Sequence, residues 1–145
     1  MCYPSSLTDT PMSIILYTDG GSRNNPGISG IGAVVYDGAK KVGEISHYLG
    51  VRTNNWAEYE AVILGLEEVR RQGFSGKDVE VRLDSKLVAE QLSRNWKIKE
   101  ESLRLQAERA WLLFPLFKSV RFTYIPREKN KEADALANLA MDRGH

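Results

Sequence analysis

The sequence predicts an α/β fold, a five-stranded mixed sheet flanked by helices, and three patterns support this prediction. Three strand-like runs follow one another in the first third of the chain, with short turns between them. Two further strand-like runs come later, each preceded by helical patterns. Strands joined by turns pair antiparallel, and strands joined by helices can pair parallel. The sheet is therefore expected to hold three antiparallel strands and then parallel ones.

The first three strands are expected over residues 14–19, 31–36 and 42–51. The first is an aliphatic run that ends in Asp19 and two glycines, which is typical of a central strand delivering a carboxylate to the edge of a sheet. An Asn-, Pro- and Gly-rich turn and the hairpin signal Asp37-Gly38 separate the runs, so they predict an antiparallel meander. Beyond them, helices are expected over residues 56–72, 86–92, 101–114 and 132–141, and strands over 77–84 and 120–125.

Length and composition favour one globular domain. The chain has 145 residues, of which 42% are hydrophobic and 27% charged, and its net charge is +1. We expect a single domain over residues 13–143 after a disordered extension over residues 1–12. Because the net charge is small, a polyanionic partner must be held by local contacts. One cysteine excludes a disulfide framework, and no apolar run is long enough for a membrane span, so we expect a cytoplasmic protein. We also expect a monomer without a protein partner.

Four acidic residues can reach one edge of the expected sheet. Asp19 and Asp84 each follow a buried strand. Glu58 lies on the apolar face of its helix, and Asp134 falls in the first turn of the last helix. Close carboxylates repel one another unless cations neutralise them, and ligands that are all oxygens favour Mg²⁺ or Mn²⁺. Two such ions about 3.5–4 Å apart are a standard device for hydrolysing a phosphodiester.

Each acid also has a purely structural interpretation. Asp19 can open a turn before a glycine, and Asp84 can cap the helix that follows it. Asp134 is favoured by the helix dipole, and Glu58 fits the third position of a capping box whose N-cap is Asn55. Only the convergence of all four acids favours a metal site.

Four short motifs, each weak alone, occur in a fixed order over residues 14–141. They are Thr18-Asp19-Gly20-Gly21 with Asn25-Pro26-Gly27, Thr53-Asn54-Asn55-x-x-Glu58, Leu83-Asp84-Ser85, and Asn130-x-x-x-Asp134. Together they resemble type 1 ribonuclease H. The resemblance implies a ribonuclease H-like fold and an endonuclease that hydrolyses the RNA strand of RNA–DNA hybrids, leaving 5′-phosphate and 3′-hydroxyl ends. It also implies that two Mg²⁺ ions, or Mn²⁺, are bound by Asp19, Glu58, Asp84 and Asp134.

The same resemblance implies which side chains contact the hybrid. Asparagine side chains suit 2′-hydroxyl groups, which distinguish RNA from DNA, and Thr53 matches a family position near a phosphate of the DNA strand. The alternative for Thr53-Asn54-Asn55 is a solvated turn before a helix. The expected substrate-binding residues are Asn24, Asn25, Thr53, Asn54, Asn55, Ser85, Trp96, Lys97 and Asn130.

Two departures from the family pattern affect these expectations. Many members carry a basic, Trp-rich protrusion after the segment that matches residues 87–92, and this chain lacks it, as the archaeal-like branch does. Trp96 and Lys97 are expected to replace it in part, the alternative being that Trp96 packs and Lys97 is solvated. Those members also carry a histidine in the loop before Asp134, and here Arg127 is the expected replacement. Arginine stays charged, so Arg127 can stabilise a phosphate but cannot shuttle a proton; its alternative is a surface charge beside Glu128.

Two other functions stay open. A shortened substrate grip is compatible with a broader nuclease that also cuts double-stranded RNA or RNA–DNA junctions. A catalytically inactive hybrid-binding module is favoured by the loss of a metal ligand, but all four acids are present. The sequence therefore favours an enzyme that acts on hybrid.

Overall fold

The structure is a computed structural model that describes residues 13–145, and it confirms the five-stranded mixed sheet. Three long strands pair antiparallel, and two short strands continue the sheet in parallel, in the order β4-β3-β2-β5-β6. The disorder expected for residues 1–12 concerns a segment outside the described residues. The strands are β2 (Ile14–Ser22), β3 (Gly27–Asp37), β4 (Lys40–Arg52), β5 (Asp78–Leu83) and β6 (Ser119–Tyr124).

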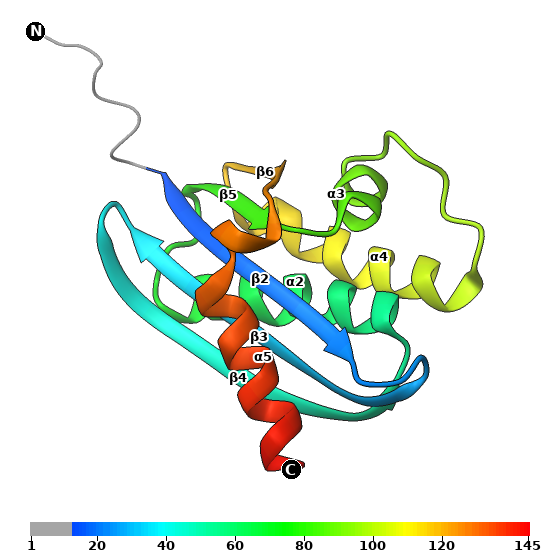
Figure 1. The fold of residues 1–145 in the computed structure, drawn as a ribbon. Coiled ribbons are helices and arrows are strands. Elements are labelled where there is room, and N and C mark those ends of the chain that lie inside the picture. Colours follow the sequence, from blue (N-terminus) through cyan, green and yellow to red (C-terminus); the bar gives the residue numbers. More distant parts are fainter. Residues whose placement is uncertain (1–12) are drawn as a thin grey trace, which may run out of the picture.

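The helices cover both faces of the sheet (Figure 1). On one face α2 packs against β2 and β3, and α4 packs on α2. On the other face α5 crosses β2, β3 and β4. The helices are α2 (Asn54–Arg71), α3 (Lys86–Leu92), α4 (Glu101–Leu113) and α5 (Lys131–Arg143), with short 3-10 helices η2 (Phe114–Leu116) and η3 (Arg127–Lys129).

The main core lies between the sheet and α2. The inward side chains of β2 and β5 alternate with outward ones, as period-2 strands require, and Leu16 and Val81 are fully buried. Gly65 on α2 permits a close approach, because a Cβ atom there would lie 2.9 Å from Leu16 Cδ1. The helix can therefore sit directly on β2, the strand that carries Asp19.

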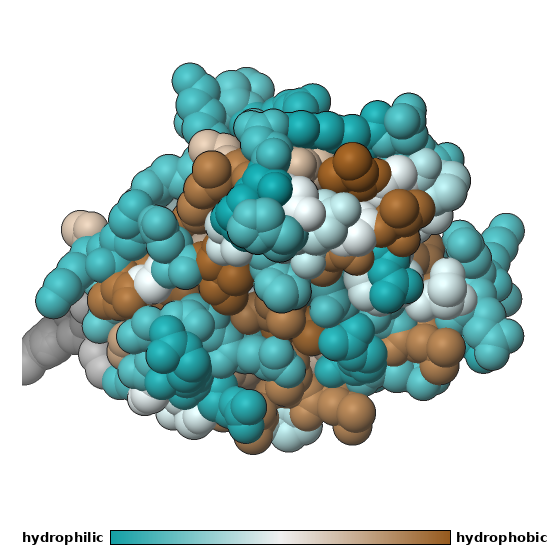
Figure 2. All heavy atoms as spheres, turned by 90° about the horizontal axis from the view of Figure 1, so that it is seen from below, coloured by the Kyte–Doolittle hydropathy of each residue, from teal (hydrophilic) through white to brown (hydrophobic). Residues whose placement is uncertain are grey.

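The surface is mixed in character. Figure 2 shows a face on which hydrophilic side chains predominate and hydrophobic ones lie between them in small groups. Among the described residues, every helix is too short or too polar to cross a membrane.

Candidate active site

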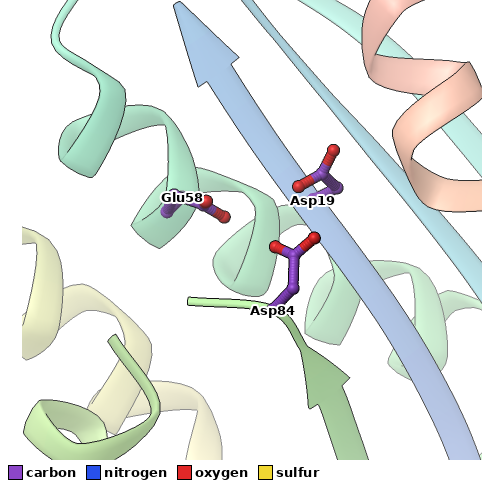
Figure 3. Close-up of side chains that lie close together, drawn as sticks. All are labelled: Asp19, Glu58 and Asp84. Carbon is purple, nitrogen blue, oxygen red and sulfur yellow. The ribbon is translucent and has the colours of Figure 1, made fainter. Parts of the chain in front are cut away.

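Three carboxylates converge beside the end of β5 (Figure 3). Asp84 directly follows β5, whereas Asp19 lies within β2, three residues before its end and not at the end as the sequence predicted. β2 and β5 run parallel in a register that pairs Tyr17 with Arg82, so Asp19 and Asp84, each two residues farther on, lie side by side. Glu58 reaches them from α2, and one carboxylate oxygen of each residue lies within 4.8 Å of the others. The convergence expected from the sequence is thus present for these three acids.

A glycine contact brings Glu58 close to β2. A Cβ atom on Gly20 would lie 2.3 Å from the backbone oxygen of Ala57, so β2 and α2 can touch only at a glycine. The Gly20 N–H donates a hydrogen bond to Glu58 Oε1 at 3.2 Å. This contact fixes the Glu58 carboxylate beside Asp19, which precedes Gly20 in the chain.

Asp134 reaches the same cleft from the other face of the sheet. A Cβ atom on Gly32 would lie 2.1 Å from the Ala133 backbone oxygen, so α5 rests on β3 at this point. Gly32 is the strand partner of Asp19, which places the first turn of α5 beside that acid. Asn130 fixes the loop before α5, because its buried Nδ2 donates to the Thr18 backbone oxygen at 2.9 Å.

The acids strongly perturb one another. Burial, followed by the charges of Glu58 and Asp84, raises the pKa of Asp19 to about 9. Burial and the Asp84 charge raise the pKa of Glu58 to about 8, although the Gly20 N–H and Arg127 oppose the shift. Burial also raises the pKa of Asp84. An acid cluster this poorly compensated by the protein is well suited to divalent cations, which supply the missing positive charge.

These groups line one cleft of about 390 Å³. Besides the four acids, it is lined by Arg127 from η3 and Asn54 from the start of α2. Arg127 thus lies where the sequence predicted a cation. Its charge lowers the pKa of both Glu58 and Asp84 relative to burial alone.

The structure contradicts two of the structural interpretations. Thr53, not Asn55, is the N-cap of α2, because its side chain accepts a hydrogen bond from the Trp56 N–H at 3.3 Å. The capping box assigned to Glu58 is therefore wrong, and α2 begins at Asn54, two residues before the predicted start. Likewise Ser85, not Asp84, caps α3 by accepting from the Val88 N–H at 3.3 Å. Both acids remain available to the cleft.

Four of the asparagines expected to contact substrate lie on two adjoining segments, and one of them, Asn54, lines the cleft. Asn25 Oδ1 accepts from the Asn54 backbone N–H at 2.9 Å, and Asn54 Oδ1 accepts from the Ser22 N–H at 3.3 Å. These bonds join the turn after β2, which also holds Asn24, to the start of α2, which holds Asn55. The Thr53 hydroxyl, by contrast, is engaged in capping the helix.

Trp96 and Lys97 lie elsewhere, in the linker between α3 and α4. Trp96 is 46% exposed, so its predicted packing alternative is wrong. Both residues line a separate hollow of about 330 Å³ together with Trp111, on whose ring Arg94 stacks at 3.8 Å. The structure does not bring them to the acids.

Other residues that sequence reasoning did not assign to the site also line the cleft. Tyr124 ends β6, and the parallel pairing of β6 with β5 places it near Asp84. Arg23 follows β2, and Met141 comes from α5. Arg23 stands directly before the predicted contact residue Asn24, so its position in the turn could have indicated it.

Known proteins share the fold of this chain. A family model described as reverse transcriptase-like matches residues 17–140. The crystal structure of RNase H1 from the halophilic archaeon Halobacterium salinarum has 41% sequence identity and a TM-score of 0.86, and the match covers 90% of this chain and 98% of that one. The chain belongs to the type 1 ribonuclease H family. Its ribonuclease H fold is also similar to LC11-RNase H1, solved in complex with an RNA/DNA hybrid, at 42% identity and a TM-score of 0.86, covering 90% of this chain and 97% of that one.

Some ribonuclease H relatives are longer proteins. The N-terminal RNase H domain of Rv2228c from Mycobacterium tuberculosis is 40% identical with a TM-score of 0.85, covering 90% of this chain and 99% of that one. Against the whole bifunctional protein Rv2228c, this chain is 41% identical over 133 residues but spans 36% of its length.

Proposed function

We propose that this protein is a metal-dependent endoribonuclease that hydrolyses the RNA strand of RNA–DNA hybrids and leaves 5′-phosphate and 3′-hydroxyl ends. The observation that supports it most is the set of three carboxylate oxygens within 4.8 Å of one another. The likeness to LC11-RNase H1, which was solved with an RNA/DNA hybrid, supports the choice of substrate.

The acid cluster fits hard divalent cations. Its donors are carboxylate oxygens only, and Glu58 is held by one backbone N–H rather than by a basic side chain. Such donors suit Mg²⁺, with Mn²⁺ as an alternative, and two ions are expected. Asp19, Glu58, Asp84 and Asp134 would hold these ions. The bound ions would supply activation of the attacking water and stabilisation of the leaving 3′ oxygen.

The remaining side chains bind and orient the strand. Arg127 keeps its charge at all working pH values and offers a fork of donors to a phosphate beside the acids. Asn25, Asn54 and Asn55 present amide groups to 2′-hydroxyls and base edges at the cleft rim, without reading a sequence. Trp96 and Lys97 are the proposed contacts farther along the hybrid, where phosphate binding adds affinity and salt dependence.

Two proposed contacts already have structural partners. Ser85 caps α3, and Asn130 holds the loop before α5, so these side chains position Asp84 and Asp134 even without substrate. Their contact with substrate remains a prediction, as do the roles of Asn24 and Thr53, the cytoplasmic location and the monomeric state.

Cleavage of end-labelled duplexes tests the proposal. An RNA–DNA hybrid, a matched double-stranded RNA and a matched DNA duplex would each be incubated with Mg²⁺, with Mn²⁺ and with chelator. We expect metal-dependent cutting of the RNA strand of the hybrid alone. Added cutting of double-stranded RNA would identify the broader nuclease, and tight hybrid binding without cutting in either metal would contradict the proposal in favour of a binding module.

A further inference from the structure

Arg23 is a cation on the cleft wall that the proposed mechanism does not use. It is the first residue after β2, and its guanidinium reaches α5. Arg23 Nη2 lies 2.7 Å from Asp142 Oδ1 and donates to Asn138 Oδ1 at 3.3 Å. The backbone of the turn is also fixed, because the Arg23 N–H donates to the Ile28 backbone oxygen at 2.8 Å. The side chain is therefore held in place before any substrate arrives.

The guanidinium still has donors to offer. All its hydrogen bonds with residues 13–145 involve Nη2, which leaves Nε and Nη1 without a partner in that range. Its side chain is 42% exposed, so a ligand can reach it. A guanidinium has five N–H donors in a rigid fork that matches the oxygens of a phosphate.

The position of the Arg23 guanidinium along α5 defines which phosphate it can contact. Asn138 and Asp142, which hold Arg23, follow Asp134 by one and two helical turns. At 1.5 Å per residue, these positions lie about 6 Å and 12 Å from Asp134 along the helix. Arg127 lies before the first turn of the same helix, so the acids have one arginine on each side along α5. With one phosphate per about 3.4 Å of axis in each strand, Arg23 reaches within about four nucleotides of the acids.

We infer that Arg23 binds a phosphate of the cleaved RNA strand a few nucleotides from the scissile one. This inference rests on the proposed function and extends it to a defined contact. The strand that enters the acid cluster is the strand that is cut, and Arg23 lines that same cleft. Asp142 and Asn138 orient the guanidinium without consuming all its donors, so the salt bridge pre-positions a phosphate ligand.

Measurements of KM and kcat on substituted proteins distinguish this role from a structural one. Arg23→Gln is expected to raise KM for hybrid roughly tenfold with kcat nearly unchanged, and to reduce the salt dependence of binding by about one phosphate contact. Arg23→Lys should restore part of the loss. Arg70→Gln is the matched control, because this exposed arginine lies twelve residues beyond Glu58, about 18 Å along α2.

Asp142→Asn distinguishes the alternatives further. It breaks the same salt bridge but keeps the guanidinium and its charge. A purely structural salt bridge would make Asp142→Asn and Arg23→Gln raise KM equally, which would overturn the inference. Phosphate binding predicts that Arg23→Gln raises KM clearly more than Asp142→Asn, which only loosens the orientation of the guanidinium.

A chemical substitution in the substrate identifies the contact directly. Single neutral methylphosphonate linkages would be placed in turn along the RNA strand and, in a second series, along the DNA strand. We expect one RNA position, away from the cut, at which the neutral linkage weakens binding to the wild type but not to Arg23→Gln. The absence of such a position, or its occurrence in the DNA strand, would overturn the inference while wild-type cleavage upheld the proposed function. Failure of the wild type to cut any hybrid would overturn both.

Discussion

Glu58 and Glu60 lie two residues apart on α2 and are almost equally buried, at 7% and 8% exposed, yet their surroundings are opposite. Glu60 faces α4, where Arg109 Nη1 and Gln106 Nε2 donate to its Oε1 at 2.8 Å and 2.9 Å. Its charge is therefore balanced and its oxygens are occupied. The protein itself supplies the hydrogen-bond and ion-pair partners of this carboxylate.

Glu58, in contrast, faces other acids. It accepts one backbone N–H, from Gly20, and its carboxylate lies beside those of Asp19 and Asp84. Burial of an acid that forms no ion pair is costly, and with the nearby Asp84 charge it raises the pKa of Glu58 to about 8 although the Arg127 charge opposes the shift. Burial alone therefore does not identify a functional acid. The lack of an ion-pair partner does identify one, because a bound cation from outside the chain must then supply the positive charge.

The largest expected effect separates the two acids by activity. Glu58→Gln should lower the rate of hybrid cleavage on the order of 1000-fold, because an amide keeps the shape but loses the charge that holds the cations. Glu60→Gln, the matched control, should stay within a few-fold of the wild type. Initial rates in Mg²⁺, on variants whose circular dichroism matches the wild type, measure both. Equal losses of cleavage rate in the two variants would contradict the distinction between Glu58 and Glu60.

The two arginines near these acids should differ in the same way. Arg127→Ala is expected to lower turnover roughly 10- to 100-fold, because it removes a charged donor from the reacting phosphate, with metal binding intact. Arg109→Ala should leave turnover nearly unchanged and lower stability instead. Single-turnover rates and thermal melts on both variants give the result. An unchanged rate for Arg127→Ala would return it to the role of a surface charge.

The free energy of unfolding should be affected in the reverse order, more by Glu60→Gln than by Glu58→Gln. In chelator, Glu60→Gln is expected to lower the free energy of unfolding by about 1–2 kcal/mol, because it removes the charge that pairs with half-exposed Arg109. Glu58→Gln should be neutral or stabilising, since it relieves repulsion among the acids. Urea denaturation of both variants measures the difference. A larger loss for Glu58→Gln would show that the acid cluster is structural.

A further expected effect is a pH dependence of the stability of the metal-free protein. The pKa of Asp19 is raised to about 9, above the roughly 3.9 of an unfolded Asp, so the folded state retains protons that the unfolded state loses. Stability in chelator should therefore fall as pH rises between these two values. Asp19→Asn should flatten the fall, and melts at pH 6, 7, 8 and 9 would record it. Parallel curves for the two proteins would contradict the assigned pKa direction.

Local patterns were enough to predict the sheet and its acids. Alternating apolar residues located the strands, and Asp19 and Asp84 could be placed together because each follows an apolar run of the parallel pair, although β2 continues to Ser22. The apolar stripe of α2 placed Glu58 on the inward face. These features depend on residues close to one another in the sequence.

The remaining features depend on contacts between distant residues. The balance of Glu60 comes from Arg109, 49 residues away, and the orientation of Arg23 comes from Asn138, 115 residues away. The N-cap of α2 was misplaced because Thr53, Asn54 and Asn55 are all good capping residues, and only the tertiary contact of Asn54 with the turn after β2 selects Thr53. The sequence likewise could not show how the α3–α4 linker folds, so it did not predict that Trp96 lines a hollow separate from the acid cleft.

Direct titration with Mn²⁺, followed by the electron paramagnetic resonance signal of the free ion, tests the central claim that the uncompensated acids form a cation site. The wild type and Glu60→Gln should remove Mn²⁺ from solution with similar affinity. Glu58→Gln and Asp84→Asn should bind at least about tenfold more weakly, because each removes an anionic ligand. If Glu58→Gln and Asp84→Asn bind Mn²⁺ as tightly as the wild type does, the uncompensated acids do not form a cation site.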